Sequence, residues 1–333
     1  TMISINPITQ FEDILRKSDT YDQLIFYLST SLNLDKPYVS FRELLIISRY
    51  DLNKLINYIS RNSPLVFEKL SENMLAFKLE KVTPIARARI VGCFVITPTK
   101  FANLFRVLSV SESDFWNKAL LPLFTSRYPH IVPVYIQQKE LEEALRKFEK
   151  MWSSITNNSG HLRVHELTTR TYQKSQSNPN KKFLETKRAW TNLELNEVFD
   201  EINSMSLIFS SIFIGFHKGP KHVISRKTQA KLKIWKRGYF SYNHYFQHLH
   251  DYLFSGLEAN IANRFNLLKD RSLAFSPLEK STPLEICYEE GVFTSTEAVR
   301  SFGEILDRYP DSSQVVFHAN PYYHANIADL SDG

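Results

Sequence analysis

Apolar residues in the first 150 positions recur mostly at helical spacing, and signals for helix starts lie between them. Thr97-Pro98 places a capping hydroxyl before a proline, a residue favoured at the first position of a helix. Ser40-x-x-Glu43 fits the capping box, in which hydroxyl and carboxylate both accept hydrogen bonds from free backbone N–H groups. These signals predict helices over 9–17, 21–32, 40–48, 52–62, 84–95, 98–108, 112–126 and 137–152. The first half is therefore expected to be mostly helical.

The pattern changes after a polar stretch at 153–160, which we take as a domain boundary. Alternating or β-branched runs predict strands over 162–172, 206–216, 230–239, 284–288 and 314–318. Helical spacing predicts helices over 192–203, 243–268 and 295–308. The expected fold class is α+β, with a helical domain over 1–152 and a mixed sheet domain over 161–333. The second domain is expected to be incomplete where the chain stops at Gly333.

Composition narrows the class of protein. Of 333 residues, 43% are hydrophobic and 23% charged, and no apolar run reaches the roughly 20 residues of a membrane helix. Two cysteines in apolar surroundings indicate a reducing compartment, so a cytoplasmic protein without a membrane partner is expected. Nine glycines and no glycine-rich phosphate loop give no indication of a cofactor.

The positive charge of the chain is concentrated in one span. The whole sequence has 41 basic and 35 acidic side chains, but the 49 residues from Ile202 to His250 contain no aspartate or glutamate. Eight lysines and arginines lie in this span, which leaves 33 basic against 35 acidic side chains elsewhere. The formal net charge of +6 is therefore a local feature of the second half.

Alternation over 230–239 predicts that one face of a strand is basic and aromatic. That face would carry Lys231, Lys233, Trp235, Arg237 and Tyr239, and the preceding segment would extend it with Lys218, Lys221, Arg226 and Lys227. Basic side chains contact phosphates and aromatic rings stack on bases, so this surface predicts binding to nucleic acid of undetermined type.

Two alternatives explain the same charge. A scaffold or regulatory subunit could dock an acidic protein partner on this span. Lysines can also protect the edge of a sheet from aggregation, although one or two would be enough for that role.

A second candidate contact lies at 38–80, where a short capped helix, a three-residue break, another helix and two short strands follow each other. This order resembles the winged helix-turn-helix superfamily, in whose DNA-binding members the second helix enters the major groove. The resemblance implies contacts from Asn53, Lys54, Asn57 and Arg61. A structural or protein-contact role is favoured over base reading, because only two of these residues are basic.

Catalytic chemistry has weaker candidates, so we do not expect an enzyme. His318, His324 and Asp329 follow a predicted strand and could serve a metal-dependent hydrolase or nuclease, although no nucleophile or known spacing accompanies them. His244 and His248 lie one turn apart near Asp251, a spacing that can hold a metal, but a solvated helix face is the simpler interpretation and no metal is expected.

Overall fold

The computed structural model of the chain describes residues 6–32, 34, 38–48, 50–61, 65–82, 89–127, 130–171, 184–204, 208–219, 230–244 and 246–275. The chain divides into two compact units, Thr1–Ala259 and Asn260–Gly333. All of the described strands lie in the first unit. From the second unit, the structure describes residues 260–275, which are helical.

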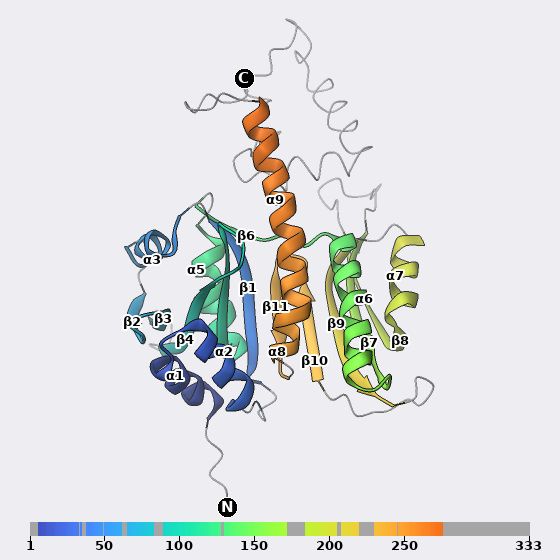
Figure 1. The fold of residues 1–333 in the computed structure, drawn as a ribbon, viewed down its shortest axis with the longest axis horizontal. Helices are drawn as coiled ribbons and strands as arrows, with labels where there is room; N and C mark the ends of the chain where they lie inside the picture. The colour runs from blue at the N-terminus through green and yellow to red at the C-terminus, as the bar shows by residue number, and fades with distance from the viewer. Residues whose placement is uncertain are drawn as a thin grey trace, which may run out of the picture. The chain divides into compact units, whose positions relative to one another are not determined.

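Helices and strands are interspersed along the first unit (Figure 1). The helical elements are α1 (Pro7–Lys17), α2 (Tyr21–Thr30), α3 (Leu52–Arg61), α4 (Ser113–Phe115), the π-helical η1 (Trp116–Leu120), α5 (Leu121–Thr125), α6 (Gln138–Ile155), α7 (Leu195–Ser204), α8 (Phe246–His248), the π-helical η2 (Leu249–Phe254) and α9 (Ser255–Phe275). The strands are β1 (Ser40–Ser48), β2 (Val66–Lys69), β3 (Leu75–Val82), β4 (Arg89–Pro98), β5 (Leu104–Ser111), β6 (Ile131–Pro133), β7 (Gly160–Thr171), β8 (Leu184–Glu194), β9 (Ile208–Lys218), β10 (Ala230–Trp235) and β11 (Tyr239–Tyr242). The fold class is thus α+β, as the sequence predicts.

The strands form one antiparallel sheet in the order β2-β3-β4-β5-β1-β11-β10-β9-β7-β8, and β6 pairs with β1 outside this path. Strand β1 joins the two halves of the chain, because it pairs with β5 on one side and with β11 on the other. The polar stretch at 153–160 connects α6 to β7 inside the first unit. The sheet therefore continues across the boundary expected from the sequence.

Helices cover the two sides of the sheet unequally (Figure 1). On one side, α3 and the α4–η1–α5 segment pack around Leu55, Trp116 and Phe124 against β1, β3, β4 and β5. On the other side, α1 contacts β4 and β5, and α6 packs Phe148 and Trp152 against Phe216 of β9. Hydrogen bonds between α6 and α7, such as Gln138 to Asn203 at 2.9 Å, hold these two helices next to each other.

Three helix predictions in the first half are wrong. The segment 40–48 is strand β1, 84–95 overlaps β4, and 98–108 overlaps β5. Strand β5 is buried at every position and β1 at most positions, so neither strand has a solvent-exposed side. Apolar spacing cannot distinguish such a strand from a buried helix. Thr97-Pro98 ends β4 and starts no helix.

The segment 38–80, which resembles a winged helix-turn-helix in sequence, differs from that fold at its start. Its first helix is strand β1, while α3 and the hairpin of β2 and β3 follow where the sequence predicts them. The order in this segment is strand, helix, hairpin, so the described structure does not confirm a winged helix. The expectation of a mostly helical first half is likewise not confirmed, because β1 to β6 lie in it.

Predictions for the second half are closer to the structure. The strands predicted over 162–172 and 206–216 correspond to β7 and β9, and the helices over 192–203 and 243–268 to α7 and α8–η2–α9. The strand predicted over 230–239 is two strands, β10 and β11, joined by a turn at 236–238. Gly238 reverses the chain there with a φ of +68°. The elements predicted over 284–288, 295–308 and 314–318 lie outside the described residues.

Candidate functional site

The side of the sheet opposite α6 carries a row of lysines and rings. Strand β10 pairs with β9 so that Lys231 lies beside Gly215, Lys233 beside Phe213, and Trp235 beside Ser211. These positions alternate with the buried Ala230, Leu232 and Ile234, which lie on the same side as Phe216. We define the lysine face by its residues on β7, β9 and β10: His161, Arg163, His165, Glu166, Phe213, His217, Lys231, Lys233 and Trp235.

The helical layer on this side of the sheet ends at the lysine face. Tyr239 of β11 belongs to the apolar cluster around Leu55, Trp116 and Phe124, and it lies next to β10. Trp235 of β10 is partly buried and packs against the edge of this cluster. Beyond Trp235 the same side carries Lys233 and the exposed Lys231. The predicted alternation of β10 is therefore confirmed, and it positions both lysines outside the apolar cluster.

The two lysines differ in how their charges are paired. The Lys233 ammonium lies 3.3 Å from Glu166 Oε1 and 5.0 Å from the centroid of the Trp235 ring. Among the described residues, no ion pair involves Lys231. Glu166 is the single carboxylate in β7, β9 and β10, so the described part of this surface has more positive than negative charge.

Tyr239 does not contribute to the lysine face, contrary to the sequence prediction. Its ring stacks on Trp235 at 4.0 Å and on Trp116 at 5.1 Å between centroids, and 8% of the residue is exposed. Its hydroxyl accepts a hydrogen bond of 2.7 Å from Arg42 Nη1. Tyr239 is on β11 because of the turn at 236–238, and it belongs to the core.

The other predicted basic contacts are dispersed. Arg237 is exposed on the turn between β10 and β11, and Lys218 is exposed at the end of β9. Lys236 lies with its ammonium 4.4 Å from the Tyr135 ring, and burial lowers the pKa of Lys236 to about 8. Lys221, Arg226 and Lys227 lie outside the described residues. Of the predicted set, Lys231, Lys233 and Trp235 therefore form one continuous surface.

Three histidines that were not predicted as site residues extend the lysine face across β9 to β7. They are His161, His165 and His217. His165 and His217 have their Nε2 atoms 3.3 Å apart, and the His161 ring stacks on His217 at 5.6 Å. Burial, followed by the charges of the neighbouring histidines and Arg163, lowers the pKa of His217 to about 4. Burial also lowers the pKa of His165, with Lys231 and Arg163 adding to the effect. Alternation in β7 could have indicated that His161 lies on the same side as Arg163.

A second group of charges is buried on the opposite side of the sheet. Arg106 of β5 lies between Glu43 of β1, at 3.5 Å, and Glu258 of α9, to which it donates a short hydrogen bond. Tyr242 donates a hydrogen bond of 2.5 Å to Glu43 Oε1. Burial raises the pKa of Glu43 to about 7, and it also raises the pKa of Tyr242. Since these side chains are at most 5% exposed, they interact with one another and are closed to a ligand.

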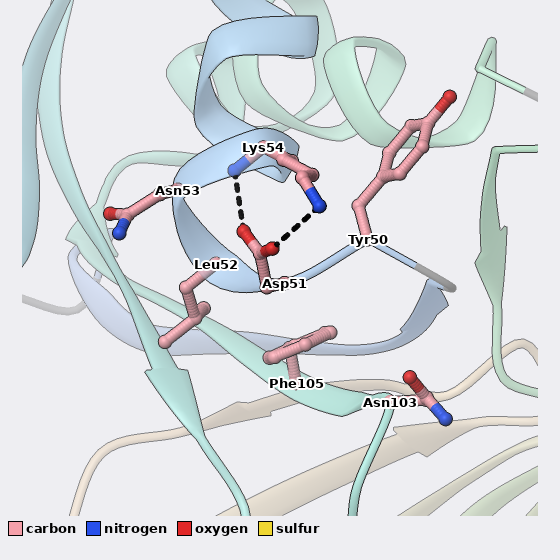
Figure 2. A pocket seen from close by; sticks show the side chains of 7 residues that line it. All are labelled: Tyr50, Asp51, Leu52, Asn53, Lys54, Asn103 and Phe105. Carbon is pink, nitrogen blue, oxygen red and sulfur yellow. Dashed lines mark hydrogen bonds and ion pairs between the residues drawn. The ribbon is translucent and has the colours of Figure 1, made fainter.

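A pocket lies at the start of α3, as Figure 2 shows. Its lining is Tyr50, Asp51, Leu52, Asn53, Lys54, Asn103 and Phe105. Asp51 accepts a hydrogen bond of 2.8 Å from the backbone N of Lys54 and lies 3.3 Å from the Lys54 ammonium. This backbone hydrogen bond is the main cause of the lowered pKa of Asp51. The Asp51 side chain thus caps the start of α3.

The contact residues predicted for α3 do lie on its exposed side. Asn53, Lys54, Asn57 and Arg61 are all exposed, while Leu55 and Ile59 on the opposite side are buried. The side chains named by the resemblance are therefore accessible, although the charge of Lys54 is paired with Asp51.

The candidate catalytic residues His318, His324 and Asp329 lie outside the described residues. In the described part of the chain, no group of three or more histidine, cysteine, aspartate or glutamate side chains could hold a metal ion, and no helix is long and apolar enough to cross a membrane. Comparison with protein-family models and with curated proteins finds no match for this chain. The function of the lysine face must therefore be inferred from its own chemistry.

Proposed function

We propose that the protein binds nucleic acid through the lysine face. The observation that carries this proposal is the position where the apolar layer ends. Trp116 of η1 stacks on Tyr239 and Tyr239 stacks on Trp235, and the next two residues of β10 on this side are Lys233 and the exposed Lys231. A sheet surface of this kind can lie along a phosphate backbone, because lysines release counterions when they contact phosphates.

The neighbouring groups favour an anionic ligand over a cation. Burial is the main cause of the lowered pKa of His165, and the charges of Lys231 and Arg163 add to it, so both cations lie near this ring. His217 is neutral at pH 7 because its pKa is about 4. His217 itself is 2% exposed, so the groups of this face that are accessible to a phosphate are Lys231, Lys233 and the partly exposed His165.

A salt titration with a charge-reversal variant tests this proposal. The affinity of the purified protein for a fluorescent oligonucleotide should fall steeply between about 50 and 200 mM salt. Lys231→Glu should weaken binding and make the logarithmic salt dependence shallower by about 0.7 to 0.9 for each phosphate contact that is lost. Lys17→Glu, on an exposed position of α1 on the other side of the sheet, changes the net charge equally and should leave the affinity close to wild type.

The outcomes separate the possibilities. Equal losses in Lys17→Glu and Lys231→Glu would show that net charge, and not this face, governs binding. An absence of oligonucleotide binding at low salt would refute the proposal. Retention of a stoichiometric acidic protein by the wild type, lost in Lys231→Glu, would indicate the scaffold alternative.

A further inference from the structure

We infer that the ligand of the lysine face is single-stranded nucleic acid, with a base stacked on Phe213 between β10 and β7; this inference rests on the proposed function. Phe213 is partly exposed and lies beside Lys233 in the register of β9 and β10. On its other side, the His165 ring lies 5.7 Å away at an angle of 45°. This partly exposed phenylalanine is thus flanked by a cation and a partly exposed imidazole.

Phe213 is the better stacking ring on this face. The Trp235 ring is already in contact with Tyr239 at 4.0 Å and with the Lys233 ammonium at 5.0 Å. His161 and His217 stack on each other and are at most 4% exposed. Phe213 is partly exposed, and its ring contact among the described residues, with His165, is tilted at 45° and not stacked, so a base can stack on it.

The shape of the surface distinguishes single strands from duplexes. Bases in a duplex are stacked on each other and show only their edges in the grooves, which helices or protruding ribbons enter. The lysine face is the side of a sheet, and its rings are set among lysines of the same strands. Lys231 and Lys233 are two residues apart on β10, or about 7 Å. They can therefore contact successive phosphates of a nucleic-acid strand while one of its bases stacks on the Phe213 ring.

The decisive experiment compares three labelled probes at one salt concentration: a 15-nucleotide oligo(dT), oligo(U) of the same length, and the oligo(dT)·oligo(dA) duplex. The single strands should bind at least tenfold more tightly than the duplex. Phe213→Leu keeps an apolar side chain of similar bulk and should weaken single-strand binding about five- to 150-fold, the range for loss of one stacking ring. Phe213→Tyr retains a ring and should bind nearly as wild type.

A direct readout does not depend on affinity. Irradiation of a complex with 5-iodouracil-substituted oligo(dT) should cross-link the base to Phe213 or His165, and mass spectrometry of the peptides identifies the position. Thermal unfolding of Phe213→Leu and Phe213→Tyr checks that both variants fold.

The inference and the proposed function can fail separately. Equal binding of duplex and single strands, with Phe213→Leu unchanged and Lys231→Glu weakened, would overturn the stacking inference and leave the nucleic-acid proposal intact. No binding of any probe would overturn both. Equal affinity for oligo(dT) and oligo(U), together with weaker binding by Phe213→Leu, supports stacking, since that contact reads neither the sugar nor the sequence.

Discussion

Replacing Glu43 by glutamine should remove a large part of the pH dependence of stability. The Glu43 side chain is 1% exposed, and burial raises its pKa from 4.5 to about 7 despite the nearby Arg106. The folded protein therefore binds this proton more tightly than the unfolded chain does. Stability from this proton is fully present below pH 4.5 and is lost as the pH rises through 7.

The magnitude follows from the size of the shift. The difference between 4.5 and about 7 corresponds to about 3 kcal/mol, at about 1.4 kcal/mol for each pKa unit. Glutamine resembles the protonated acid and retains an oxygen that can accept the hydrogen bond from Tyr242. The free energy of unfolding of Glu43→Gln, relative to wild type, should therefore increase by about 3 kcal/mol between pH 4.5 and pH 8.

Urea unfolding followed by tryptophan fluorescence, at several pH values in this range, measures the difference. Glu72→Gln is the matched control, because the Glu72 side chain is 93% exposed and its substitution should give a nearly constant difference. If the difference in the free energy of unfolding between Glu43→Gln and wild type is also constant with pH, the raised pKa of Glu43 is contradicted. It would mean that Glu43 stays ionised and that the attraction of Arg106 outweighs burial.

Three further predictions concern the buried groups. Arg106→Met should lower the free energy of unfolding, measured in urea, by about 3–5 kcal/mol, because Glu43 and Glu258 lose their partner. The control Arg16→Met, at a side chain that is 43% exposed, should cost less than about 1 kcal/mol. Burial lowers the pKa of His250 to about 3. The free energy of unfolding of the wild type should therefore fall by up to about 1.4 kcal/mol for each pH unit below 6.5. His250→Gln should lack this part of the pH dependence. Tyr239→Phe should cost about 1–3 kcal/mol because the buried Arg42 loses one of its acceptors, and it should leave the oligonucleotide affinity unchanged. Weaker binding would show that Tyr239 contacts the ligand after all.

Local signals in the sequence were sufficient where an element has one solvent-exposed side or a well-formed cap. The helix predicted over 52–62 is α3, with Leu55 and Ile59 buried and its start capped by Asp51. Alternation placed Lys231 and Lys233 on the opposite side from Leu232 in β10. In both cases the contrast between apolar and polar positions survives in the sequence, because one side contacts water.

Contacts between distant segments determined the rest. Strands β1 and β5 are covered on both sides, so their sequences contain no contrast between a buried and an exposed side. Arg106 and Glu258 are 152 positions apart, and only the packing of α9 on the sheet pairs their charges. The turn at 236–238 removed Tyr239 from the predicted surface, and pairing of β7 with β9 brought His165 next to His217. Alternation along β10 was enough to give the residues that this strand contributes to the lysine face. The neighbours of those lysines depend on strand pairing, which arises from contacts that no local pattern records.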